Sequence, residues 1–339
     1  MVYVVIVFLW TAILLYILLG GADYGAGIIE LFTSKANRPE TRKKMYEAIG
    51  PIWEANHMWL IIVIVILFVG FPKIYTTVSI YLHIPLVCML LGIIARGTAF
   101  VFRNYDAVKD DMQKVYTRIF VLSSVITPFF LGIIAASSVS GQIDVSAHDF
   151  LSAYIFSWLN WFSVTTGLFT VTICAYLAVI FIIGETDNEK DRKHFTRKAR
   201  HMIFVVMGAG ALVFIASFFE GIPLLQWILN DLPGIIAIIM ASISLGIMFY
   251  LLNKNKPLIL RLLAGFQVTM ILFAATYSHF PDIVLLKGGS NLSLLTHQGQ
   301  LKTMETLGYA LLIGSVFILP ALFYLIYSFQ KKPDIPNEH

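Results

Sequence analysis

Nine apolar stretches of about 20 residues each dominate this chain of 339 residues. A helix needs about 20 apolar residues to cross the roughly 30 Å hydrocarbon core of a bilayer. The pattern therefore predicts an all-α polytopic membrane protein of about nine transmembrane helices in helical bundles, with residues 1–339 forming a single integral membrane domain. The predicted helices span residues 2–22, 52–71, 79–101, 119–137, 153–183, 202–219, 233–252, 258–277 and 306–329.

The composition excludes a soluble globular domain. Hydrophobic residues make up 58% of the chain and charged residues only 13%, and the mean hydropathy is +0.80. An average soluble domain is about 45–50% apolar and about 25% charged.

The positions of Lys and Arg predict the orientation, because basic residues in short loops stay on the cytoplasmic side. Of the 24 basic residues, 20 lie in the loops after the first, third, fifth and seventh predicted helices, in the helical turn next to such a loop, or in the C-terminal tail. We therefore expect the N-terminus outside and the C-terminus in the cytoplasm, which requires an odd number of crossings. The net charge of +4 follows from this topology and does not predict a nucleic-acid partner.

Two carboxylates lie at or beside the ends of predicted helices. Asp23 stands in the run GGADYGAG at residues 20–27, and Glu54 stands in GPIWEANHMWL at residues 50–60. A carboxylate close to hydrocarbon is energetically costly and by default marks a functional site. Because the topology puts both acids at the cytoplasmic face, they suggest a route for protons.

A polar cluster is expected around these acids. His57 follows Glu54 by three residues and shares its helix face. Arg96 lies near the inner end of the third predicted helix, about two turns before Arg103. Asp23, Glu54, His57 and Arg96 can therefore meet, with Arg96 offsetting the buried negative charge.

Each of these residues also has a purely structural interpretation. Glu54 can be a helix-start carboxylate favoured by the helix dipole. The glycines around Asp23 include Gly21 and Gly25, whose spacing lets helices pack closely. Arg96 can extend to the lipid headgroups as an anchor.

Histidines invite a haem or metal interpretation, but the eight of this chain are scattered along it. Only His57, His83 and His279 lie near membrane depth, and the topology puts His57 inside and the other two outside. A polar histidine in a network is therefore favoured over a haem ligand, and no metal site is predicted in this chain.

Several ordered motifs resemble subunit II of the cytochrome bd-type quinol oxidases. They are the glycine-rich run at residues 20–27, GPIWEANHMWL at residues 50–60, LFVGFP at residues 67–72 and IARGTAFVFR at residues 94–103. The motifs cover the first third of the chain, while its length, helix number and short loops fit the family throughout.

The resemblance implies an obligate heterodimer in a bacterial or archaeal plasma membrane. The partner, subunit I, would carry two b-type haems and one haem d, or a third b-type haem in its place, and the outer quinol-binding loop. This chain would bind no haem and catalyse nothing alone. It would support subunit I in an electrogenic complex that oxidises quinol and reduces dioxygen to water. Membrane lipid, quinone and a small single-helix accessory subunit are the other expected partners.

The resemblance also implies roles for single residues. The family has acidic residues at the positions of Asp23 and Glu54, both associated with a cytoplasmic proton path. Trp53 and Trp59 match the family's tryptophans that flank this path. His57 stands where relatives often carry another polar residue.

Two other functions stay open from the residues themselves. A secondary transporter also carries intramembrane acidic residues, although the interrupted helices and two-half symmetry typical of transporters are not evident in this sequence. A structural anchor without chemistry of its own is the third interpretation.

Overall fold

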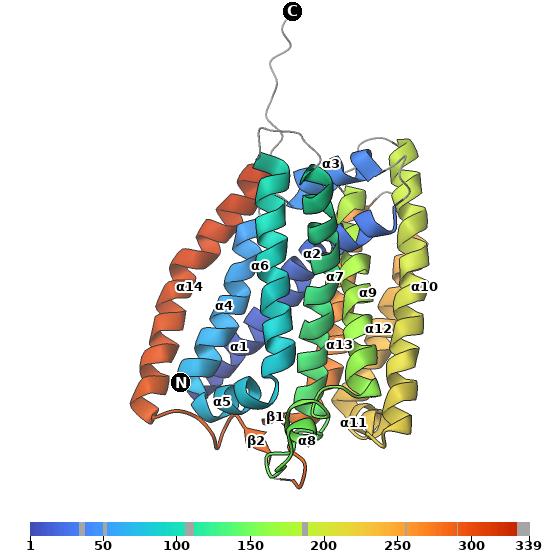
Figure 1. The fold of residues 1–339 in the computed structure, drawn as a ribbon. Coiled ribbons are helices and arrows are strands. Elements are labelled where there is room, and N and C mark those ends of the chain that lie inside the picture. Colours follow the sequence, from blue (N-terminus) through green and yellow to red (C-terminus); the bar gives the residue numbers. More distant parts are fainter. Residues whose placement is uncertain are drawn as a thin grey trace, which may run out of the picture.

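The computed structural model describes residues 1–33, 38–49, 53–105, 112–184, 189–254, 256–289 and 291–330. Nearly all of these residues are helical, and the long helices stand side by side in one bundle (Figure 1). The elements are α1 (Val2–Leu15), the π-helical turn η1 (Tyr16–Gly20), α2 (Gly21–Leu31), α3 (Arg38–Ile49), α4 (Trp53–Gly70), α5 (Pro72–Tyr81), α6 (His83–Tyr105), α7 (Met112–Val139), α8 (Phe150–Tyr154), α9 (Trp161–Gly184), α10 (Glu189–Phe219), α11 (Leu224–Leu229), α12 (Leu232–Leu251), α13 (Pro257–Thr276), the 3-10 turn η3 (Tyr277–His279), β1 (Asp282–Val284), β2 (Leu292–Ser293) and α14 (Leu301–Gln330).

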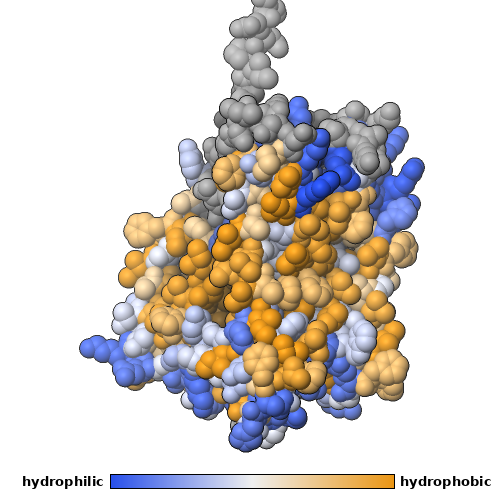
Figure 2. All heavy atoms as spheres, viewed as in Figure 1, coloured by the Kyte–Doolittle hydropathy of each residue, from blue (hydrophilic) through white to orange (hydrophobic). Residues whose placement is uncertain are grey.

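The structure confirms the predicted class. Within the described ranges, eight helices are long and apolar enough to cross a membrane, and a bent pair raises the number to nine if it counts as one span. Figure 2 shows a broad apolar band across the middle of the face in view, with hydrophilic side chains gathered at the end drawn lowest and at the upper right. An apolar band between polar ends is what a membrane-embedded bundle presents to lipid.

The first helix is longer than predicted. We expected it to end at residue 22, but the helical span runs from Val2 to Leu31 through η1. The glycine-rich run does not end the helix, because several of its glycines lie against neighbouring helices rather than in a turn. Asp23 is therefore inside the helix and not at its end.

The second predicted helix, 52–71, is one half of a bent pair. α4 ends at Gly70, and α5 starts at Pro72 after a turn of 115°. Proline is well tolerated in the first turn of a helix but cannot continue the preceding one. The predicted third helix, 79–101, begins later, at His83, because residues 79–81 belong to α5.

The fifth predicted helix, 153–183, is split. Its first residues form the short helix α8 and an irregular segment, and the long helix α9 begins at Trp161. We expected these polar and aromatic first turns in the interface, and they lie at the end of the bundle that also holds β1, β2 and α11 (Figure 1).

Three other helices extend beyond their predicted starts: α7, α10 and α14 begin at Met112, Glu189 and Leu301, against predicted starts of 119, 202 and 306. The added turns are polar, so hydropathy identifies only the apolar part of each helix, which is the part expected within the hydrocarbon core.

The start of α1 and the end of α14 lie at opposite ends of the bundle. α1 begins at the end that holds α5, and α14 runs to the end that holds α3 (Figure 1). This agrees with an odd number of crossings, while the assignment of these ends to the outside and the cytoplasm stays a prediction. Contacts between Lys44 and Asp191, and between Lys198 and Thr33, join α3, α10 and the end of α2 at the basic face.

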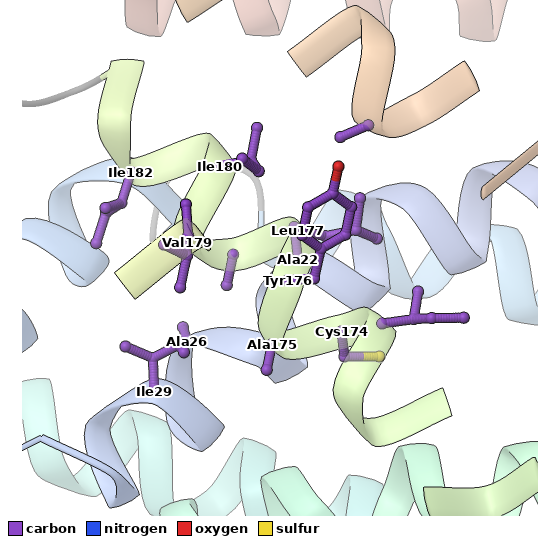
Figure 3. Close-up of a cluster of buried hydrophobic side chains, with 14 of the residues drawn as sticks. Ala22, Ala26, Ile29, Cys174, Ala175, Tyr176, Leu177, Val179, Ile180 and Ile182 are labelled. Carbon is purple, nitrogen blue, oxygen red and sulfur yellow. The ribbon is translucent and has the colours of Figure 1, made fainter. Parts of the chain in front are cut away.

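The centre of the bundle is the contact between α2 and α9. Figure 3 shows small and branched side chains of α2, such as Ala22 and Ala26, facing a row on α9 that runs from Cys174 to Ile182. Gly25 allows this approach, since a Cβ at that position would lie only 1.9 Å from the backbone oxygen of Cys174. At Gly21 a Cβ would lie 3.3 Å from Leu177.

We expect Gly25→Ala to destabilise the protein by about 1–3 kcal/mol, the usual cost of overpacking a core. The added methyl group collides with backbone, which cannot rotate away. Gly208→Ala is the matched control, because nothing lies within 4 Å of a Cβ there and alanine favours helix over glycine. Thermal unfolding of the two purified variants in detergent measures the difference. Equal midpoints for Gly25→Ala and Gly208→Ala would contradict the close α2–α9 contact.

Candidate functional site

The site is centred on an ion pair between Asp23 and Arg96. Nη1 and Nη2 of Arg96 donate to the two carboxylate oxygens of Asp23, each at 2.7 Å, and Nη2 also donates to the backbone oxygen of Asp23 at 2.9 Å. Both side chains are only 1% exposed. Bidentate geometry of this kind is the strongest form of the arginine–carboxylate contact.

The Arg96 guanidinium has further contacts beyond Asp23. Its Nε donates to Ser124 Oγ of α7 at 3.0 Å, so all three guanidinium nitrogens donate. The guanidinium carbon lies 4.9 Å from the ring centre of Tyr24 and 4.8 Å from that of Phe120, at cation–π distance. Arg96 therefore points into the protein and does not extend to the headgroups.

A second ion pair lies two turns further along both helices. Nη1 of Arg103 donates to one carboxylate oxygen of Glu30 at 2.9 Å, and Arg42 of α3 donates to the other at 2.6 and 2.9 Å. The Glu30 side chain is 3% exposed. Arg103 also lies 4.0 Å from the ring of Phe120, so this ring is in contact with both arginines.

Glu30 is the acid that sequence reasoning missed, although a signal was present. Asp23 and Glu30 are seven residues apart, and so are Arg96 and Arg103. Seven residues make about two helical turns, so each pair of like side chains shares one helix face. Matched spacing of acids and bases on two helices predicts two parallel ion pairs once the first helix is extended beyond residue 22.

The acidic motif at the start of α4 is only partly described. Trp53 and Glu54 are in its first turn, but their side chains lie outside the described part of the structure. His57 is partly buried, and its ring centre lies 6.4 Å from that of Tyr24. Trp59 is 5% exposed and belongs to the same buried cluster as Tyr24.

The structure thus joins Asp23 and Arg96 directly and brings His57 to their neighbour Tyr24. It leaves the expected participation of Glu54 untested. Gly21 and Gly25 lie on the face of α2 toward α9.

Two tyrosines of the first helix were also missed. The hydroxyl oxygens of Tyr16 and Tyr24 are 2.8 Å apart, and the residues are 3% and 1% exposed. Their pairing depends on the π-helical turn η1, which starts at Tyr16. No pattern that we recognised in the sequence predicts such a turn.

The histidines near membrane depth lie apart from one another. His57 contacts Tyr24, His83 contacts Tyr154, and His279 contacts Trp227 with ring centres 4.2 Å apart. No two of the three form a facing pair of axial ligands. Across the described residues, no three side chains of His, Cys, Asp or Glu come together as a metal site requires.

The chemistry of this cluster is that of protons and charge. Carboxylates, phenol hydroxyls and an imidazole accept and donate protons through hydrogen bonds, and an arginine keeps a nearby carboxylate in its charged form. Such groups at membrane depth mark ion or proton pathways.

Comparison with known proteins identifies relatives of the whole chain. A family model described as cytochrome bd terminal oxidase subunit II matches residues 1–329. A cytochrome bd ubiquinol oxidase subunit 2 of Bacillus subtilis (strain 168) is 30% identical over 199 residues, which are 58% of this chain and 57% of that relative. The matched part therefore spans little more than half the length of this relative.

A second relative and a solved structure extend the likeness over nearly all of the chain. A putative cytochrome bd menaquinol oxidase subunit II of Bacillus subtilis (strain 168) is 21% identical over 341 residues, covering 95% of this chain and 94% of the relative. A chain in the structure of bd oxidase from Geobacillus thermodenitrificans has a TM-score of 0.75 at 19% identity, covering 96% of this chain and 98% of that one. This last likeness shows a shared fold.

We expect Arg96→Gln to destabilise the protein by about 3–5 kcal/mol, because it leaves Asp23 buried without its charged partner. The double variant Asp23→Asn/Arg96→Gln should recover most of this loss, since no uncompensated charge remains. Lys193→Gln is the control: its pair with Glu189 is exposed and contributes less than about 1 kcal/mol. Thermal unfolding in detergent measures all three. A double variant no more stable than Arg96→Gln alone would contradict the ion-pair account.

Proposed function

This chain belongs to the family of cytochrome bd terminal oxidase subunit II, and we propose on that basis that it is the second subunit of a quinol:oxygen oxidoreductase. The complex oxidises quinol and reduces dioxygen to water. This subunit binds no haem, supports the haem-bearing subunit I and contributes a cytoplasmic proton path. The family match favours this function over a secondary transporter.

The single observation that carries the proton path is the buried pair of Asp23 and Arg96 within a membrane-spanning helix. Charged groups at that depth cost several kcal/mol unless they are paired, and charged residues inside membrane-spanning helices typically mark ion or proton pathways. The path comprises Asp23, Glu54 and His57, flanked by Trp53 and Trp59.

The two acids have different tasks in this proposal. Both carboxylate oxygens of Asp23 accept hydrogen bonds from Arg96, so Asp23 supplies fixed charge and orientation. Glu54 is the residue that takes up and releases protons from the cytoplasm. Arg96 and Arg103 are the supporting charges that keep the inner end of the path from accumulating negative charge.

The electron-transfer groups belong to the partner in this proposal. Subunit I carries two b-type haems and either haem d or a third b-type haem, and the pair forms an obligate heterodimer in the plasma membrane of a bacterium or archaeon. The scattered arrangement of His57, His83 and His279 on three different aromatic partners supports an assignment of the haems to the other subunit. Lipid, quinone and a small single-helix subunit complete the assembly.

Co-purification tests the proposal. The tagged chain, extracted from its own membrane in mild detergent, should bring with it a larger haem-containing protein. The dithionite-reduced minus oxidised spectrum should show haem bands, and the preparation should consume oxygen when quinol is added. A colourless protein that consumes no oxygen, even when it is co-expressed with the haem-bearing subunit I, would overturn the proposal.

We expect Glu54→Gln to lower turnover per haem at least about tenfold, since a positioned proton-transfer group contributes about 10²–10⁴-fold in rate. Glutamine keeps the shape of the side chain and removes its titratable proton. Haem content should be unchanged. Glu189→Gln, at an exposed position, is the control and should leave turnover unchanged. Loss of haem with normal turnover in the remaining haem would instead assign a structural role to Glu54.

A further inference from the structure

The hydrogen-bonded pair of Tyr16 and Tyr24 is buried at membrane depth and has no part in the function described so far. Their hydroxyl oxygens are 2.8 Å apart, and both residues are almost completely enclosed. The rings meet edge to face, with centres 6.4 Å apart. Two phenols that only filled space would be served as well by phenylalanine, which carries no polar atom into the bilayer.

The helix is distorted in a way that creates this pair. In a regular α-helix, residues eight apart differ by about 80° in direction, whereas residues seven apart share a face. The π-helical turn Tyr16–Gly20 holds about one extra residue. Tyr24 therefore points in the direction, relative to Tyr16, that residue 23 would have in a regular α-helix. π-helical turns of this kind occur frequently at functional sites.

Gly20 leaves room for the arrangement. A Cβ at this position would lie 3.2 Å from Cδ2 and Cε2 of Tyr16, which is tighter than ordinary van der Waals contact. The absence of a side chain at Gly20 therefore allows the Tyr16 ring to lie along the helix toward Tyr24.

The pair adjoins the charged site at one end and reaches the middle of the span at the other. Tyr24 follows Asp23, contacts Arg96 through its ring face and lies beside His57. Tyr16 stands halfway along the 30-residue span Val2–Leu31. Its backbone lies about 12 Å from that of Tyr24 at a rise of about 1.5 Å per residue, while the two hydroxyl oxygens meet at 2.8 Å.

The proton count of the pair suits a relay. Two hydroxyls bring two protons, and the one hydrogen bond between them uses only one. The other proton remains for donation to an acceptor. When a proton reaches the first oxygen, a new O–H bond forms there, and the O–H bond that pointed to the second oxygen breaks. The released proton forms an O–H bond with the second oxygen, whose own O–H bond breaks as its proton passes to the next acceptor. Rotation of both hydroxyls restores the starting state, and no charged phenolate accumulates.

We propose that Tyr24 and Tyr16 form the next segment of the proton path, carrying protons onward from the Asp23–His57 region. This inference rests on the proposed function and deepens it. It assigns to the π-helical turn the task of aligning two hydroxyls along the helix, where a regular helix would place them on different faces.

The test compares Tyr16→Phe, Tyr24→Phe and the double variant in the purified complex with its partner. Each should lower quinol-dependent oxygen consumption per haem at least about tenfold and alter its solvent deuterium isotope effect. The rate at which quinol reduces the haems without oxygen should be unchanged, because that step takes up no proton through this path.

The double variant separates a relay from a structural role. Removing one hydroxyl leaves the other buried without a partner, whereas removing both can be nearly neutral for stability. A structural role therefore predicts recovery of turnover in the double variant, and a relay predicts continued loss. Recovery, or normal turnover in either single variant, would overturn the proposal.

Tyr176→Phe is the matched control. Its hydroxyl is also buried and donates to Gln267 Oε1 at 2.6 Å, but it belongs to α9 and lies outside the path. This variant should keep normal turnover and a normal isotope effect.

Wild-type complex that lacks haem or oxidase activity would refute the proposed function itself, while active wild type with active tyrosine variants would refute only the relay.

Discussion

The cost of placing charge in hydrocarbon governs the part of this structure around Asp23 and Arg96. Asp23 lies inside a membrane-spanning helix, and an unpaired carboxylate there would be strongly destabilising. Arg96 offsets this cost, but only because α6 brings its guanidinium past α7 to reach α2, with Ser124 and Phe120 as further contacts. The ion pairs Asp23–Arg96 and Glu30–Arg103 both join α2 to α6, and a movement of α6 relative to α2 that broke the deeper pair would expose both its charges to an apolar medium.

Close packing makes that burial complete. A Cβ on Gly25 would overlap the backbone of α9, and a Cβ on Gly27 would lie 2.2 Å from Ser124 Oγ of α7. α2 is thus pressed between two helices at the level of Asp23, and solvent and lipid are excluded from the pair. The glycine-rich run was interpreted both as a helix-packing motif and as the surroundings of a functional acid. The two interpretations describe the same arrangement, because water is excluded from the carboxylate only where the helices pack closely.

The sequence predicted the features that follow from hydropathy and charge, and it missed those that follow from local backbone geometry. The all-α class and family were predicted correctly, and Asp23 and Arg96 were expected together because a buried acid needs a base. Glu30 was missed because the glycines were taken as the end of the first helix. Tyr16 was missed because a π-helical turn changes which residues share a helix face, and the amino-acid composition does not indicate such a turn. The bend at Phe71 coincides with the predicted end of the second helix, but the sequence analysis did not predict that a separate helix, α5, follows it directly.

The charges along the first helix also bear on where the proposed proton path can begin. At the depth of Asp23, one acid and one arginine cancel. Nearer the basic face, Glu30 is shared by Arg42 and Arg103, and this group carries one excess positive charge. An excess positive charge repels an approaching proton, so the direct line along α2 through Glu30 is unfavourable. The proposed path through Glu54 and His57 does not use this line. The basic face is the one that the distribution of Lys and Arg predicts to be cytoplasmic, and the proposed path begins there.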